Sequence, residues 1–279
     1  MEKDKKYLIT GASGYLGRAL IKRLLEKGFT NLVAMARNEG ELLRLKADFP
    51  TVHVIPGDVA DTYAVATAAK GVSGVFHLAA FKHVTMAEEN VRQCVYSNVI
   101  GSLNVLNLQG LDFIMGISTD KAAQVSSVYG ATKFLQERLF SDYEKMNPNT
   151  KYRTVRYGNV MYSTGSVLCK WKDQLKKGET LTVTDEDSTR FYWTVDQAVD
   201  LIFQCLEEST DATPFFTPMK AMRLGDLLEA MKMKYGTSGS KHEVIGLQIG
   251  ENKHEVISAT IPSSDKAERY TVEEILSLV

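Results

Sequence analysis

Two side chains that can move a proton together are Tyr129 and Lys133, which stand four residues apart in the run Tyr-Gly-Ala-Thr-Lys. Residues four apart share one face of an α-helix. A tyrosine with its ordinary pKa of about 10 is a poor base at neutral pH, and an ammonium group one helical turn away stabilises the phenolate and lowers that pKa. The pair is therefore predicted to take a proton from a substrate hydroxyl group while a hydride leaves the same carbon.

A second polar group, Ser118-Thr119-Asp120-Lys121, follows an apolar run and precedes Tyr129 by only a few residues. A strand that ends at Ser118 would bring these side chains to the start of the helix that carries Tyr129. The Asp-Lys pair then has two interpretations. It is either part of the same active site as Tyr129, or an ion pair on the protein surface.

A glycine-rich turn opens the chain. The run Thr10-Gly11-Ala12-Ser13-Gly14-Tyr15-Leu16-Gly17 joins a short apolar strand to a helix with apolar residues at helical spacing. In such a turn the first glycine allows a sharp bend, the second lets backbone approach a pyrophosphate, and the third lets helix and strand pack closely. The helix N-terminus presents unpaired N–H groups to the phosphates. This pattern predicts a dinucleotide site.

The second expected strand, Asn31–Ala36, is followed directly by Arg37, where an NAD site usually carries an acidic residue for the ribose 2′-hydroxyl. Arginine can instead pair with a 2′-phosphate, so the cofactor is predicted to be NADP. Asp58 and Val59, after the third strand, are expected beside the adenine. The full set of expected cofactor contacts is Thr10, Gly11, Ser13, Gly14, Tyr15, Leu16, Gly17, Arg37, Asp58, Val59, Ala79, Ala80, Lys82, Tyr129, Lys133 and Tyr157.

The elements that must position these residues alternate along the first half of the chain. Short apolar runs predict strands at Tyr7–Thr10, Asn31–Ala36, Val52–Pro56, Val75–Leu78, Phe113–Ser118 and Arg153–Tyr157. Helical segments are expected between them, at Tyr15–Lys27, Glu39–Phe49, Thr62–Lys70, Glu89–Leu108 and Ser127–Lys145. Strict alternation predicts an α/β fold with a doubly wound, Rossmann-like parallel sheet.

After Gly158 the alternation changes, and helices are expected at Ser166–Lys177, Thr194–Leu206 and Leu224–Tyr235. We therefore predict a cofactor-binding domain over residues 1–158, which carries the catalytic residues, and a small C-terminal substrate-binding lobe over 159–279. Some elements of the lobe are allowed to return to the edge of the sheet.

Composition sets the remaining bounds. The 279 residues are 44% hydrophobic and 24% charged, with a net charge of −1, which gives no basic surface for nucleic acid. No apolar run is long enough to span a bilayer, and no signal peptide is evident. Three scattered cysteines fit neither a disulfide framework nor a metal site. We expect a cytoplasmic protein without a metal.

Several motifs carry a family resemblance. TGASGYLG, HLAA, STDKAA and YGATK resemble the extended short-chain dehydrogenase family. More narrowly, AAFKHV, STDKAA, RYGNV, TRF and GENKHEV resemble its polysaccharide-biosynthesis branch, the UDP-N-acetylglucosamine 4,6-dehydratases, including those that invert C5. The similarity runs from about Tyr7 to about Ser258. One departure is the loop at 122–128, which lacks the proline usually found there.

The resemblance implies a reaction. Oxidation at C4 of the hexose makes the C5 proton acidic, water is then lost across C5 and C6, and hydride returns to C6. It assigns Lys121 as the base at C5, Asp120 as the acid at the C6 oxygen and Thr119 as a hydrogen-bond partner of the C4 oxygen, beside Tyr129 and Lys133. These roles need a neutral Lys121 and a protonated Asp120, so both pKa values must be shifted. Expected contacts of the nucleotide-diphosphate sugar are Lys82, Asn159, Ser166, Val167, Arg190 and Glu255.

Two alternatives remain. A nucleotide-sugar 4-epimerase shares the oxidation at C4, although the Asp120-Lys121 pair argues against it. A non-catalytic NADP-binding regulator would be expected to have lost Tyr129, Lys133 or the glycines, and all are present. By analogy with the fold, the helices Glu89–Leu108 and Ser127–Lys145 are expected to form a homo-oligomer contact.

Overall fold

The computed structural model describes all residues from Met1 to Val279 and has a central sheet of six parallel strands. Their order across the sheet is β3-β2-β1-β4-β5-β6. The four inner strands consist of buried residues because helices cover both faces of the sheet. The bounds are β1 (Tyr7–Thr10), β2 (Leu32–Ala36), β3 (His53–Pro56), β4 (Gly74–His77), β5 (Phe113–Thr119) and β6 (Lys151–Tyr157).

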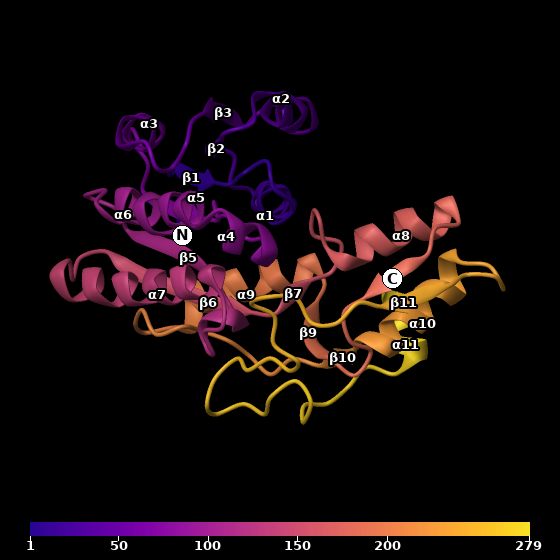
Figure 1. The fold of residues 1–279 in the computed structure, drawn as a ribbon. Helices are drawn as coiled ribbons and strands as arrows, with labels where there is room; N and C mark the ends of the chain where they lie inside the picture. The colour runs from indigo at the N-terminus through magenta and orange to yellow at the C-terminus, as the bar shows by residue number, and fades with distance from the viewer.

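Helices cover the two faces in separate cores. One core joins α1, α2 and α9 to the sheet, and a second joins α3, α6 and α7 to its other face. The predicted α/β fold with a doubly wound parallel sheet is confirmed (Figure 1). The bounds are α1 (Tyr15–Glu26), α2 (Glu39–Asp48), α3 (Thr62–Ala68), α6 (Gly101–Leu106), α7 (Val128–Met146) and α9 (Val195–Glu208).

The prediction of a single helix over Glu89–Leu108 is wrong. A short helix, α4 (Val84–Glu89), ends before Asn90, and α5 (Val91–Val95) then runs through a π-helical turn at Tyr96–Ile100 into α6. The wider turn contains Asn98, which is fully buried. Its side-chain amide accepts a hydrogen bond from the Phe81 N–H at 2.7 Å and donates to the Phe81 carbonyl at 2.9 Å. The π turn therefore secures the loop after β4.

The chain after Gly158 contributes to two cores. A third apolar cluster is built around α8, α10 and α11, which lie together beyond the end of the sheet (Figure 1). In contrast, α9 packs with α1 in the first core, and Phe215 forms a parallel bridge with Val155 of β6. The elements of this part are β7 (Asn159–Val160), α8 (Val167–Lys177), β8 (Leu181–Val183), β9 (Thr189–Trp193), β10 (Ala221–Arg223), α10 (Leu224–Tyr235), β11 (His242–Val244) and α11 (Val272–Leu278).

Candidate active site

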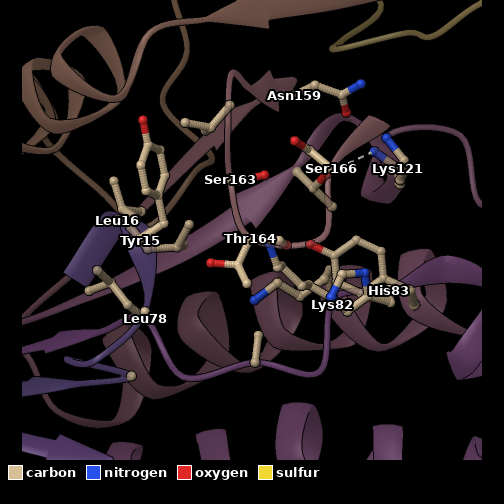
Figure 2. Close-up of a pocket in the computed structure, with 18 of the residues that line it drawn as sticks. Tyr15, Leu16, Leu78, Lys82, His83, Lys121, Asn159, Ser163, Thr164 and Ser166 are labelled. Carbon is tan, nitrogen blue, oxygen red and sulfur yellow. Dashed lines mark hydrogen bonds between the residues drawn. The ribbon is translucent and has the colours of Figure 1, made fainter. Parts of the chain in front are cut away.

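One cavity of about 820 Å³ lies at the carboxyl ends of the six parallel strands and extends to β7, α8 and β9. Open parallel sheets bind ligands at this edge. Lys121, Asn159 and Ser166 lie on one side of the cavity, and Tyr15 and Leu16 lie on the other (Figure 2). The catalytic and cofactor residues predicted from separate motifs thus meet around one space.

The glycine turn at the end of β1 has the geometry that a dinucleotide needs. Gly11 has φ of +65°, and a Cβ atom there would lie 2.7 Å from the Ala79 backbone nitrogen. Only glycine fits both the conformation and this contact. The N-cap of α1 is Gly14, which offers no side-chain cap, so N–H groups of the first turn remain open to a ligand phosphate. The turn fits a pyrophosphate.

Arg37 lies at the end of β2 and lines the cavity together with Asp58. Its guanidinium is 3.7 Å from the Asp58 carboxylate, and the Arg37 side chain is 62% exposed. This ion pair is long and open to solvent, so the guanidinium can turn to an added phosphate at little cost. The position fits the predicted contact with a ribose 2′-phosphate.

A buried carboxylate connects Thr119 to Lys121. The Thr119 hydroxyl donates to Asp120 Oδ1 at 2.8 Å, and Lys121 Nζ donates to the same oxygen at 3.0 Å. The Asp120 side chain has no exposed surface, and its Oδ2 has no hydrogen-bond partner. The interpretation of Asp120 and Lys121 as a surface ion pair is therefore excluded.

The start of α7 packs directly against this segment. A Cβ atom at Gly130 would lie 2.4 Å from the Lys121 carbonyl oxygen, so only glycine permits the approach. Ser127 caps the helix by accepting a hydrogen bond from the Gly130 N–H at 3.1 Å. These two contacts place Tyr129 beside Thr119 and Lys121 at the cavity.

The protonation of Tyr129 differs from the expectation. Burial raises the pKa of Tyr129 to about 12, and the charge that opposes this shift is the ammonium of Lys121. Lys133 instead donates to Gln136 Oε1 at 2.6 Å, and burial lowers the pKa of Lys133 to about 8. The predicted lowering of the Tyr129 pKa by Lys133 is thus wrong for this arrangement, because the Lys133 ammonium bonds elsewhere and both groups are desolvated.

Of the two pKa shifts predicted for Asp120 and Lys121, only the one for Asp120 is found. Burial raises the pKa of Asp120, which favours the protonated acid as predicted. Burial of Lys121 disfavours its ammonium form, but the carboxylates of Asp120 and Glu255 outweigh that effect and raise the Lys121 pKa above its ordinary value. The expectation of a neutral Lys121 is therefore wrong for the protein alone.

Most of the predicted contact residues line the cavity, and three do not: Thr10, Asp120 and Glu255. The Thr10 hydroxyl accepts from the Ala79 N–H at 3.2 Å and bonds His77 at 2.9 Å, so it orders the turn after β4 instead. Asp120 reaches the cavity only through Thr119 and Lys121. Glu255 is 2% exposed and lies 3.3 Å from Lys121 Nζ. These three residues therefore do not contact a ligand in the cavity directly; they hold the residues that do.

Other cavity residues were missed by the sequence reasoning. Thr164 lines the cavity, and its carbonyl accepts a hydrogen bond of 2.9 Å from the predicted contact residue Lys82, while Tyr192 of β9 carries a buried hydroxyl without a partner. No local spacing identifies them, because they reach the cavity from elements distant in sequence. The additional lining residues include His83, Ser97, Ser163, Thr164, Lys170, Thr182, Thr184, Tyr192, Gln248 and Glu251.

The parallel sheet, the glycine turn and the cavity at the strand ends define a Rossmann-fold protein of the short-chain dehydrogenase class. A family model described as polysaccharide biosynthesis protein matches residues 7–278, and the chain belongs to that family. The resemblance stated from the motifs is thereby confirmed.

Relatives within this family have different names. The chain is 31% identical to a UDP-N-acetylglucosamine 4,6-dehydratase (inverting) of Campylobacter jejuni, over all of this chain and 84% of the relative. It is also 31% identical to a UDP-glucose 4-epimerase of Rickettsia rickettsii, over 96% of this chain and 82% of the relative. The solved structure of Pen from Bacillus thuringiensis superposes with a TM-score of 0.92 at 28% identity, over 99% of this chain and 97% of that one. The chain is thus similar to enzymes that modify nucleotide sugars.

No helix of the protein combines the length and the apolar character that crossing a membrane requires.

Proposed function

We propose that the protein is an NADP-dependent nucleotide-hexose 4,6-dehydratase that acts on a UDP-N-acetylglucosamine-type substrate in the cytoplasm. The observation that carries the proposal is the Asp120–Lys121 pair, buried next to Tyr129 at the cavity wall. Oxidation at C4 requires Tyr129 but no further base or acid. An amine and a carboxyl group beside it supply the additional base and acid that loss of water from C5 and C6 needs.

A nicotinamide dinucleotide, when bound, supplies the acceptor and donor of hydride. The glycine turn would hold its pyrophosphate, and Arg37 would hold the 2′-phosphate of NADP. Tyr129 takes the proton of the C4 hydroxyl, and Thr119 holds the C4 oxygen. The raised pKa of Tyr129 makes it a stronger base once deprotonated, and the nearby Lys121 ammonium stabilises the phenolate.

The elimination uses the neighbouring pair. Lys121 lines the cavity and takes the C5 proton as a neutral amine. Asp120, whose pKa is raised by burial, supplies the proton that leaves with the C6 oxygen. Because Asp120 does not itself line the cavity, this proton reaches the substrate only after the Asp120 side chain turns or through its hydrogen bonds to Thr119 and Lys121.

The substrate lies across the strand ends toward α8. Lys82, Asn159, Ser166 and Val167 line this part of the cavity. Arg190 also lines it, and because its Nη1 atom already donates to the Thr189 and Lys253 carbonyls at 2.9 Å each, only the rest of the guanidinium is left for a diphosphate. Glu255 is no longer proposed as a substrate contact, because it lies behind Lys121 and Arg190 and does not line the cavity.

A second candidate is a nucleotide-sugar 4-epimerase, favoured by the similarity to the enzyme of that name. It would share the oxidation at C4 and then return hydride to C4. The Asp120–Lys121 pair would have no proton to handle at C5 or C6.

The test is incubation of the purified protein with a panel of nucleotide hexoses, read by mass spectrometry. A dehydratase gives a product lighter by one water, whereas an epimerase leaves the mass unchanged. Tyr129→Phe should stop both reactions at the first step. Conversion of a hexose at C4 with no loss of water on any substrate would refute the dehydratase.

A further inference from the structure

Glu255 occupies an unexpected place among the charged groups of the site. Its Oε1 atom is 3.3 Å from Lys121 Nζ and 3.8 Å from Arg190 Nε. Both cations line the cavity, whereas Glu255 does not. The carboxylate therefore supports the cavity wall from behind.

The position of Glu255 is fixed by its own backbone. The Glu255 N–H donates to Ser264 Oγ at 2.8 Å, and the Ser264 N–H donates to the Glu255 carbonyl at 2.9 Å. The second carboxylate oxygen accepts a long hydrogen bond of 3.4 Å from Asn252. Because the Glu255 backbone and the second carboxylate oxygen are both hydrogen-bonded, the carboxylate has little freedom to move with the Lys121 side chain.

We propose that Glu255 is a positioning residue that holds the proton on Lys121 and holds Lys121 against Asp120. It thereby sets the pH at which Lys121 becomes a base. The role of Lys121 in the reaction rests on the proposed function; the effect of Glu255 on the protonation of Lys121 does not.

The pair beside Glu255 can form the neutral base and acid without any other reactant. One proton moves from Lys121 Nζ to Asp120 Oδ1 along their 3.0 Å hydrogen bond. The products are an amine with a free electron pair and a neutral carboxylic acid, and the net charge is unchanged. Glu255 opposes this transfer, because an ammonium at 3.3 Å compensates its own buried charge.

The charged and titratable groups that face Lys121 come from four segments. Asp120 is its neighbour, Tyr129 comes from α7, Arg190 and Tyr192 come from β9, and Glu255 comes from the C-terminal loop. Arg190 disfavours the Lys121 ammonium, and both carboxylates favour it. Burial raises the pKa of Tyr129 to about 12, so in the protein alone its hydroxyl carries no negative charge that would favour the Lys121 ammonium. Glu255 is thus the one acidic neighbour of Lys121 that the elimination itself does not use.

The test measures the reactivity of Lys121 directly in the full-length protein. Only a neutral amine reacts with acetic anhydride, so the rate of Lys121 acetylation at a fixed pH reports its neutral fraction. Peptide mass spectrometry reads this rate against Lys22, an exposed lysine in α1. Removing an opposite charge at this distance lowers a lysine pKa by about 1–3 units. Glu255→Gln should therefore raise the relative rate about 10- to 1,000-fold between pH 8 and 9.

Two further variants separate charge from packing. Glu255→Asp keeps the charge and should label within a few-fold of the wild type. Glu144→Gln removes a carboxylate from a different buried arginine, Arg153, and should leave Lys121 labelling unchanged. Equal labelling of wild type and Glu255→Gln, or equal acceleration in all three variants, would overturn the proposal.

If Glu255→Gln does not fold, Arg190→Gln gives a test of opposite sign. Loss of the opposing guanidinium should slow Lys121 labelling below the wild-type rate, and faster labelling would contradict the proposal. With substrate, the rate of deuterium exchange at C5 in Glu255→Gln should begin to rise at a pH about 1–3 units lower than in the wild type. A labelling shift without any dehydration would refute the proposed function and leave the role of Glu255 standing.

Discussion

Replacing Arg37 by alanine should weaken binding of NADP and leave binding of NAD unchanged. The Arg37 side chain is 62% exposed, so its interaction with a phosphate is best estimated with the dielectric constant of water. Two unit charges 4 Å apart then attract by about 1 kcal/mol, and a doubly charged phosphate roughly doubles that value. The expected loss is about 2 kcal/mol, or 10- to 30-fold in Kd.

The assay is isothermal titration of the protein freed of nucleotide with NADP and with NAD. Arg44→Ala is the matched control, because Arg44 is an exposed arginine of α2 that pairs with Glu41 outside the cavity. It should change neither affinity. Added salt should reduce the preference for NADP in the wild type, since an exposed pair is screened.

Two results would refute this reasoning. One is a wild-type protein that binds NAD more tightly than NADP. The other is an Arg37→Ala variant that binds NADP as tightly as the wild type, which would assign the cofactor phosphate to another group.

Three other predictions concern the catalytic pair, the buried histidine and the oligomer. Lys121→Ala should still reduce the bound cofactor but exchange no deuterium into C5, and Asp120→Asn should slow release of the dehydrated sugar about 10²- to 10⁴-fold in a stopped assay. Burial lowers the pKa of His77 to about 3, so the unfolded chain binds a proton below pH 6.5 that the folded protein does not. Stability is then lost as the pH falls, and from pH 6.5 to 4.5 urea unfolding should show about 2–3 kcal/mol more loss in the wild type than in His77→Asn. Tyr96 and Leu135 are half exposed on the helices expected at the oligomer contact, and light scattering at micromolar concentration should show at least a dimer.

The fold was largely predictable because its signals are local. The four inner strands, β1, β2, β4 and β5, are short and mostly apolar runs, as a sheet covered by helices on both faces needs. The failure at Glu89–Leu108 has a nonlocal cause. Asn98 bonds the Phe81 backbone and the Thr132 hydroxyl, and the π turn that allows this cannot be read from helical periodicity.

The features of the site also divide into those that local sequence predicts and those that depend on residues distant in the chain. The glycine turn and the spacing of Tyr129 and Lys133 identify one cavity from sequence alone, since each depends on neighbours along the chain. The charge state of Lys121 does not follow from its neighbours along the chain. It depends on Glu255 and Arg190, which the C-terminal loop and β9 bring to the same point.

The free energy needed to desolvate the charged cluster around Lys121 supports a chemical role for that cluster. Asp120, Glu255 and Arg190 are each less than 10% exposed, and Lys121 is 17% exposed. A buried ion pair seldom stabilises a fold more than well-packed apolar residues would, because desolvation offsets the attraction between the charges. In addition, Asp120 Oδ2 is buried without a hydrogen-bond partner, which adds to the cost of desolvation. Such an arrangement is expected where one proton must be held close to two possible positions. Lys121 provides one of them at the wall of the cavity, and Asp120 provides the other directly behind it.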